Sequence, residues 1–404
     1  MTEPLDPDDA LGVPLAEKAV APEQRTLFKT LVGVAWMYGG RGVGLLWTLA
    51  LIGKLSIGDY GLYAMAFAVA TILGPTLDNP WNVRAMRESE DRFLAERASR
   101  YLVGATLMAA GAALIPFTFI GFLGLVVAGG DMVFNSYISR DIRDGHPDRV
   151  YKWSTSKQLA GVTLAATYLF TVHDPTLFGA CALYCVPYVV ILVLAGFSVL
   201  RHRPALPGSL RLMAILMGEM GFGTTLYLQG DVLLLGWLTN TTTVGYYNIA
   251  LMVTSALAAV GQSFAMTYHE PLRKSGGDLS TAPKLRTTLI VGAAAGLVTL
   301  VIGVGLLLSP APTVVAYSMF IMAGFAGLRS VIAVFQVILY AQRRDRLRFT
   351  AAVTLIPFKF LFLAVLVWMG LGAIGASIAT TTADAALLAV FAVALYWRRK
   401  EPAS

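Results

Sequence analysis

The sequence predicts an all-α integral membrane protein, and three observations predict it. Of the 404 residues, 56% are hydrophobic and only 14% are charged, whereas a soluble domain carries about 25% charged residues. The mean hydropathy is +0.67. Apolar runs long enough for a bilayer crossing, about 20 residues each, occur about twelve times. This composition leaves almost no room for a water-soluble enzyme, and the 39 Gly and 18 Pro form no fibrous or disordered repeat.

The chain divides into two tails, two lobes and a linker. Residues 1–26 are predicted to be a disordered cytoplasmic tail, because they are acidic and lack the apolar centre of a signal peptide. The N-lobe, 27–200, holds spans at Thr30–Ile52, Tyr60–Leu77, Tyr101 to about Phe119, about Ile120 to Ile138, Ser154–Val172 and Leu177–Leu200. After a cytoplasmic linker, 201–211, the C-lobe, 212–397, holds spans at Leu212–Leu238, Val244–Met266, Leu289–Leu308, Val314–Tyr340, Phe349–Met369 and Ala373–Trp397. Residues 398–404 are a second cytoplasmic tail.

The basic residues outside the spans gather at the two termini and in alternate loops. These regions hold 26 of the 31 Lys and Arg side chains, and the opposite loops hold one, Lys54. By the positive-inside rule both termini are cytoplasmic, so the number of spans is even. This parity divides the 38-residue apolar run Tyr101–Ile138 into two spans and gives twelve. The opposite loops are too short for an outer catalytic domain.

An internal repeat links the two halves. The segments Gly61–Val69 and Gly245–Val253, 184 residues apart, share a Gly, a Tyr, an Ala and a Val at equivalent positions. Chance is the alternative explanation in a chain so rich in Ala and Leu. Both segments open an even-numbered span after a short outer loop. Parallel repeats of this kind are typical of transporters with two six-helix bundles around a central site.

The same residues carry a resemblance to a known family. The run Leu55-Ser-Ile-Gly-Asp-Tyr-Gly-Leu-Tyr-Ala64, with Asp78 and the charged segment 84–88 after it, resembles the opening of Wzx-type polysaccharide exporters. Segment 231–250 is similar to a second signature of these exporters, which are lipid-linked oligosaccharide flippases of the MOP superfamily, to which MATE carriers also belong. The resemblance implies two pseudo-symmetric six-helix lobes around a central cavity. It also implies alternating access that moves polyprenyl-diphosphate-linked sugars outward.

Eight ionisable residues fall inside the predicted spans. The bases are Arg41, Lys157, Arg329 and Lys359, and the acids are Asp131, Glu219, Asp231 and Asp384. Each would cost about 2.5 to 3.5 kcal/mol at the bilayer centre, so they are expected to face the protein interior or a wet cavity. In one interpretation they form buried ion pairs. In the other, the four bases line a cationic cavity that binds a diphosphate.

The acids are candidates for coupling transport to an ion gradient, with H⁺ or Na⁺ as the coupling ion. Asp384 and Glu219 are favoured for this role. Asp231 and Asp131 belong to the same group, and for Asp231 a conformational or helix-end role is an equal alternative. Asp78, just before Pro80, is expected at a helix end or gate. No catalytic residue, metal cluster or other cofactor is expected, and no phosphate-binding loop motif occurs.

The predicted function is that of a secondary carrier and not of an enzyme. It would flip a polyprenyl-phosphate- or diphosphate-linked saccharide to the outer leaflet of a bacterial plasma membrane, for cell-envelope polysaccharide synthesis. A monomer surrounded by membrane lipids is expected, with envelope glycosyltransferases or a polymerase as partners and no nucleic acid. The alternatives are a MATE-like multidrug or cation antiporter and a non-transporting scaffold of an envelope-assembly complex.

Overall fold

The computed structural model describes residues 39, 42–85, 88–144, 146–206, 217 and 222–397. Over these ranges every regular element is a helix. The first is Gly42–Lys54, and α2 Ile57–Ala85, α3 Glu90–Ala113, α4 Phe119–Arg143, α5 Pro147–Thr171 and α6 Leu177–Val199 follow. The second half contains α8 Gly223–Leu238, α9 Thr241–Met266, α10 His269–Lys274, α11 Leu285–Leu307, α12 Thr313–Ala341, α13 Asp345–Trp368 and α14 Gly372–Ala392, with a π-helical turn at Val393–Trp397.

Each predicted span overlaps one of these helices. The spans Thr30–Ile52 and Leu212–Leu238 are described only in their second parts, as Gly42–Lys54 and α8. Eight helices of the described chain are long and apolar enough to cross a membrane. Helices α3 and α5 have 24 and 25 residues but carry more charge. The chain is therefore a multi-pass membrane protein, while the total of twelve crossings stays a prediction, as do the two tails.

The apolar run Tyr101–Ile138 is confirmed as two helices. Helix α3 ends at Ala113, a turn containing Pro116 follows, and α4 begins at Phe119. The hydroxyl of Thr118 accepts a hydrogen bond from the backbone N–H of Gly121 at 3.4 Å and so caps α4.

The predicted start of the third span, Tyr101, is wrong for the helix. Helix α3 begins eleven residues earlier, at Glu90, within a segment that the charge pattern assigned to a loop. The reason is that Arg92, Glu96 and Arg100 are four residues apart and share one helix face. Glu96 and Arg100 are buried there, although their charge alone suggested solvent.

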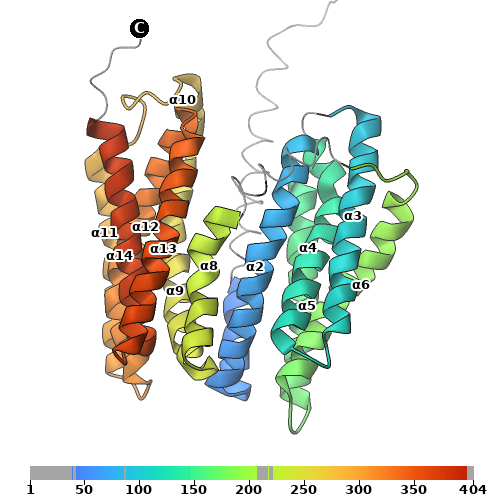
Figure 1. Cartoon of the computed structure of the whole chain (residues 1–404), viewed down its shortest axis with the longest axis horizontal. Coiled ribbons are helices and arrows are strands. Elements are labelled where there is room, and N and C mark those ends of the chain that lie inside the picture. The colour runs from blue at the N-terminus through green and yellow to red at the C-terminus, as the bar shows by residue number, and fades with distance from the viewer. Residues whose placement is uncertain are drawn as a thin grey trace, which may run out of the picture.

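The helices form two groups that meet along α2, α8 and α9 (Figure 1). Helices α2 to α6 make up one lobe around a single apolar core. Helices α8 to α14 make up the other, around two further clusters of buried side chains. Ala64 and Ala68 of α2 belong to one of these clusters, so α2 packs against both lobes. This arrangement confirms the predicted all-α, two-lobe architecture.

A buried ion pair fixes the predicted cytoplasmic end of the first lobe. Arg100 donates from Nε and Nη2 to the two oxygens of Asp78, at 2.6 and 2.5 Å. Asn135 of α4 donates to the same carboxylate at 2.7 Å. Nearby, Arg84 binds Glu96 through two hydrogen bonds, and these bonds raise the pKa of the Arg84 guanidinium. Asp78 lies within α2, which continues past Pro80 to Ala85, and it joins α2, α3 and α4 as an ion-pair partner. Its expected role at a helix end or gate stays a prediction.

Replacement of Arg100 by methionine is expected to destabilise the protein strongly. The Asp78 carboxylate would stay buried without its cation, which typically lowers the free energy of unfolding by about 3 to 5 kcal/mol. Thermal unfolding of the purified protein in detergent measures the effect. Arg140→Met is the control, because that side chain is 62% exposed and an exposed pair contributes about 1 kcal/mol or less.

The double variant Asp78→Leu with Arg100→Met removes both charges and is expected to recover much of the lost stability. Unfolding of Arg100→Met at the wild-type temperature would contradict the structural role of the pair.

Candidate functional site

A cavity of about 1360 Å³ lies between the two lobes. It is lined by side chains from the helix Gly42–Lys54, from α2, α5 and α6, and from α8, α9, α10, α12, α13 and α14. At one end the lining includes Tyr60, near the start of α2. At the other end it includes His269, Arg346 and Arg348, which lie at the predicted cytoplasmic ends of their helices. The cavity therefore runs from the predicted cytoplasmic side toward the outer ends of α2 and α9.

The repeat glycines pack against each other beside the outer end of this cavity, next to the lining residue Tyr60. A Cβ atom added to Gly61 of α2 would lie 2.8 Å from the backbone nitrogen of Gly245 in α9, so only glycine permits this approach. A Cβ on Gly245 would in turn lie 2.9 Å from Cγ1 of Ile57. Close by, Asn248 donates a hydrogen bond to the hydroxyl of Tyr60 at 2.7 Å. The two copies of the sequence repeat thus pack against each other where the lobes meet (Figure 1).

Lys359 lies in the second lobe at the cavity wall and is almost fully buried. Its Nζ is 2.8 Å from Oδ2 of Asp231 and donates to the backbone oxygen of Tyr227 at 2.8 Å. The Asp231 carboxylate also accepts hydrogen bonds from Thr380, at 2.7 Å, and from Tyr247. The ammonium and the carboxylate are therefore matched inside the lobe, with α8, α9, α13 and α14 all contributing.

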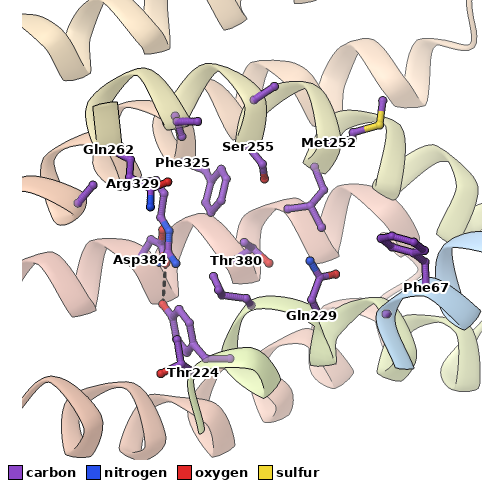
Figure 2. Close-up of a pocket in the computed structure, with 18 of the residues that line it drawn as sticks. Phe67, Thr224, Gln229, Met252, Ser255, Gln262, Phe325, Arg329, Thr380 and Asp384 are labelled. Carbon is purple, nitrogen blue, oxygen red and sulfur yellow. Dashed lines mark hydrogen bonds and ion pairs between the residues drawn. The ribbon is translucent and has the colours of Figure 1, made fainter. Parts of the chain in front are cut away.

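A second pair stands beside the first. Arg329 of α12 lies 3.4 Å from Oδ1 of Asp384 in α14, and Figure 2 shows the two side chains side by side. The hydroxyl of Tyr227 donates to the same oxygen at 2.7 Å. Because the Tyr227 backbone oxygen binds Lys359, one residue connects both ion pairs. Oδ2 of Asp384 is buried and has no hydrogen-bond partner in the described part of the chain.

Lys157 forms the third pair, in the first lobe. Its Nζ lies 2.5 Å from Asp131, over the rings of Phe134 and Tyr188. Lys157 is not part of the cavity lining, whereas its neighbour Gln158 is.

The structure therefore combines the two interpretations of the buried charges. The bases Lys157, Arg329 and Lys359 each pair with a predicted acid, and two of them, Arg329 and Lys359, also line the cavity. Arg41 and Glu219 lie outside the described residues, so their positions stay predictions. The roles of all these residues in binding or coupling stay predictions as well.

Sequence reasoning missed the neutral groups that complete the site. Tyr227, Tyr247 and Thr380 hold the two central carboxylates. The cavity is also lined by five amide side chains, Gln158, Gln229, Asn248, Gln262 and Gln336. Neutral polar residues give no signal in a charge count. An inspection of amides within the apolar spans could have found all five, because each lies inside a predicted span.

No model of a known protein family matches the sequence, and no curated protein matches it either. Solved structures do. The lipid II flippase MurJ in an inward closed conformation superposes with a TM-score of 0.64 at 11% identity, over 90% of this chain and 87% of MurJ. An inward-facing multidrug resistance MATE family transporter of the MOP superfamily superposes with a TM-score of 0.53 at 14% identity, over 93% and 96%. The fold is that of the MOP-superfamily transporters. The Vibrio cholerae MATE transporter VcmN, as an aspartate-to-asparagine mutant, shares this MOP fold with a TM-score of 0.51 at 14% identity, over 92% and 96%.

This likeness confirms the predicted fold and concerns the fold alone, since all three identities are low. The resemblance to Wzx-type exporters within the MOP fold stays a prediction.

Replacement of Gly61 by valine is expected to keep the outer end of the cavity open. The added side chain would overlap the backbone of Thr241 and Gly245, so α2 and α9 could not approach. The test is a single cysteine, Asn248→Cys, in a chain whose two native cysteines are alanine. A membrane-impermeant thiol reagent added outside should label it several-fold faster when Gly61→Val is present.

Gly305→Val is the control for Gly61→Val, because a Cβ at Gly305 meets nothing within 4 Å. Equal labelling with glycine and with valine at position 61 would show that this contact does not close the cavity.

Proposed function

We propose that the chain is an alternating-access flippase in a bacterial plasma membrane, with both termini cytoplasmic. Its substrate is a saccharide linked to a polyprenyl phosphate or diphosphate, which it moves from the cytoplasmic to the outer leaflet for cell-envelope polysaccharide synthesis. The observation that carries this proposal is the cavity between the lobes. Its volume of about 1360 Å³ exceeds the range of about 300 to 1,000 Å³ typical of sites for drug-sized ligands.

The cavity lining supports a head group that is both hydroxylated and anionic. Five amide side chains offer donors and acceptors, as saccharide hydroxyls require. The ionised side chains among the described lining residues are Arg329, Arg346, Arg348 and Lys359 against Asp345 and Asp384, which leaves a net positive charge. A cationic drug would meet repulsion there. This charge balance favours the flippase over the MATE-like antiporter, and a scaffold has no use for such a cavity.

One protein of similar structure supports a lipid-linked substrate. MurJ is a lipid II flippase, so one protein of similar fold moves a lipid. In this chain, Arg41, Arg329 and Lys359 are the proposed ligands of the phosphate groups, with Lys157 supporting the first lobe. The apolar tail would stay in the bilayer between the lobes. Membrane lipids surround the carrier, and envelope glycosyltransferases or a polymerase act before and after it.

Ion coupling is proposed for Asp384. Its carboxylate is buried, pairs with Arg329 at 3.4 Å and leaves Oδ2 without a hydrogen-bond partner among the described residues. Binding of H⁺ would weaken its attraction for Arg329 and leave that guanidinium available to a phosphate. Na⁺ would act in the same sense. Glu219 is the second candidate from the sequence, and Asp231 and Asp131 act as partners of their lysines.

The variants Arg41→Gln and Arg329→Gln are expected to slow transport by about 10-fold to 100-fold each. The reason is that a hydrogen bond to a charged group contributes about 1.5 to 3 kcal/mol. Lys359→Met is combined with Asp231→Asn, and Arg329→Gln is also made together with Asp384→Asn, so that no buried carboxylate is left without its cation. Depletion of the wild-type protein, followed by lipid analysis, measures whether one lipid-linked intermediate accumulates on the inner leaflet and which variants relieve it.

Arg286→Gln is the control for these variants, because Arg286 is exposed on α11 and does not line the cavity. Absence of any accumulated intermediate, together with hypersensitivity to cationic drugs, would instead favour the antiporter.

Asp384→Asn is expected to abolish the response of transport to an ion gradient, because the amide can neither bind a proton nor carry a charge. Transport is measured in proteoliposomes with an imposed pH gradient and, separately, an imposed Na⁺ gradient. Asp384→Glu keeps the carboxylate and should retain part of the response. If Asp384→Asn responds to both gradients as the wild type does, the coupling ion binds elsewhere.

A further inference from the structure

The predicted cytoplasmic mouth of the cavity carries two arginines that are distinct from the central pairs. Arg346 and Arg348 lie in the first turn of α13, and both line the cavity. Arg346 is exposed, and no ion pair joins it to another described residue. Tyr340 and His269, whose rings stack with centroids 6.3 Å apart, complete this mouth.

Arg348 is held in place but keeps one edge of its guanidinium unused. Nη1 donates to Asp345 at 3.0 Å, and the group lies over the Tyr340 ring, 5.4 Å from its centroid. Nε is buried and finds no hydrogen-bond partner in the described chain. Nε and Nη2 form the edge with which Arg100 binds both oxygens of Asp78. The same edge of Arg348 therefore lacks the acceptor that a two-oxygen anion would supply.

The central bases Lys359 and Arg329, in contrast, each have an acceptor within the protein. Lys359 is bound by a carboxylate and a backbone oxygen, and Arg329 is paired with Asp384. An anion entering from the predicted cytoplasmic side would meet unpaired donors at the mouth before it met the paired ones. Lys359 follows Arg346 by thirteen residues in α13, which corresponds to about 20 Å along the helix axis.

We propose that Arg346 and Arg348 form an entry site for a phosphate or diphosphate ester at the mouth of the cavity. The ester is the head group of the isoprenoid-linked substrate, so this inference rests on the proposed function. A turn of the Arg348 side chain brings its buried Nε into the cavity, where the Nε and Nη2 edge binds two phosphate oxygens, and Arg346 neutralises the remaining charge. Asp345 orients Arg348 through Nη1. The site captures the head group on the cytoplasmic side and delivers it to the central pairs.

A phosphate group also occurs on the anionic lipids of the bilayer, and the geometry favours the substrate over them. Both arginines belong to the lining of the cavity between the lobes, and not to the lipid-facing apolar surface formed by residues such as Leu361 and Trp368 farther along α13. A bilayer lipid bound at random would be held by surface bases as well. Binding of an isoprenoid diphosphate should therefore depend on these two residues specifically.

The test uses the full-length protein in nanodiscs of phosphatidylcholine, with farnesyl diphosphate as the probe and farnesol as its phosphate-free counterpart. The wild type should bind farnesyl diphosphate well above farnesol. The double variant Arg346→Gln with Arg348→Gln should bind it about tenfold more weakly, as the loss of charge-assisted hydrogen bonds predicts. Replacement of both arginines by lysine should restore part of the affinity.

Arg343→Gln is the matched control, since Arg343 precedes the same helix, is exposed and does not line the cavity. Unchanged affinity in the glutamine double variant would overturn the entry site. Equal competition by phosphatidylglycerol added to the nanodiscs would also overturn it, because the site would then bind bilayer phosphate in general.

Transport separates this inference from the proposed function. The glutamine double variant should raise the substrate concentration for half-maximal transport and leave the maximal rate nearly unchanged. A wild-type chain that binds farnesyl diphosphate through these arginines but moves no lipid-linked saccharide would contradict the function and retain the site. A chain that transports normally with both arginines replaced would retain the function and lose the site.

Discussion

The structure depends on one constraint: a charge placed among apolar helices must find its counter-charge within the protein, because the bilayer offers no water. Four of the described pairs obey it by joining different helices. Asp78 links α2 to α3, Asp131 links α4 to α5, and Asp231 links α8 to α13. Asp384 links α14 to α12. The ion pairs thus help to decide which helices are neighbours, and the cavity lies among the helices they hold.

The sequence predicted the helices well because hydrophobic runs and helix length respond to the same bilayer thickness. The break between two helices around Pro116 was predicted from the even number of spans that the charge pattern requires. Gly61 and Gly245 stood out as equivalent positions of the repeat, but the sequence did not show that they contact each other. The extension of α3 to Glu90 was missed. There a helix face carries charges whose partners come from α2 and α4, and hydropathy registers only the charge.

The sequence showed which charged residues belong to the candidate site, but not which of them contact each other. Arg329, Lys359, Asp231 and Asp384 stand out as charges within apolar runs. Their pairing depends on contacts between segments 55 residues apart for Arg329 with Asp384 and more than twice as far for Lys359 with Asp231, which periodicity cannot supply. Arg346 and Arg348 were used only to orient the chain. Their second feature, a position in the cavity wall, needs the packing of α12 against α13.

The close contact of Gly61 with Gly245 has a mechanical consequence. In the part of the chain that the structure describes, every ion pair lies within one lobe. The lobes instead meet through glycine backbone and neutral hydrogen bonds such as that of Asn248 with Tyr60. Ion pairs therefore stiffen each lobe internally, while the lobes can separate without breaking an ion pair. Such a seam favours rocking of two rigid bodies, in which the lobes exchange one set of weak contacts for another.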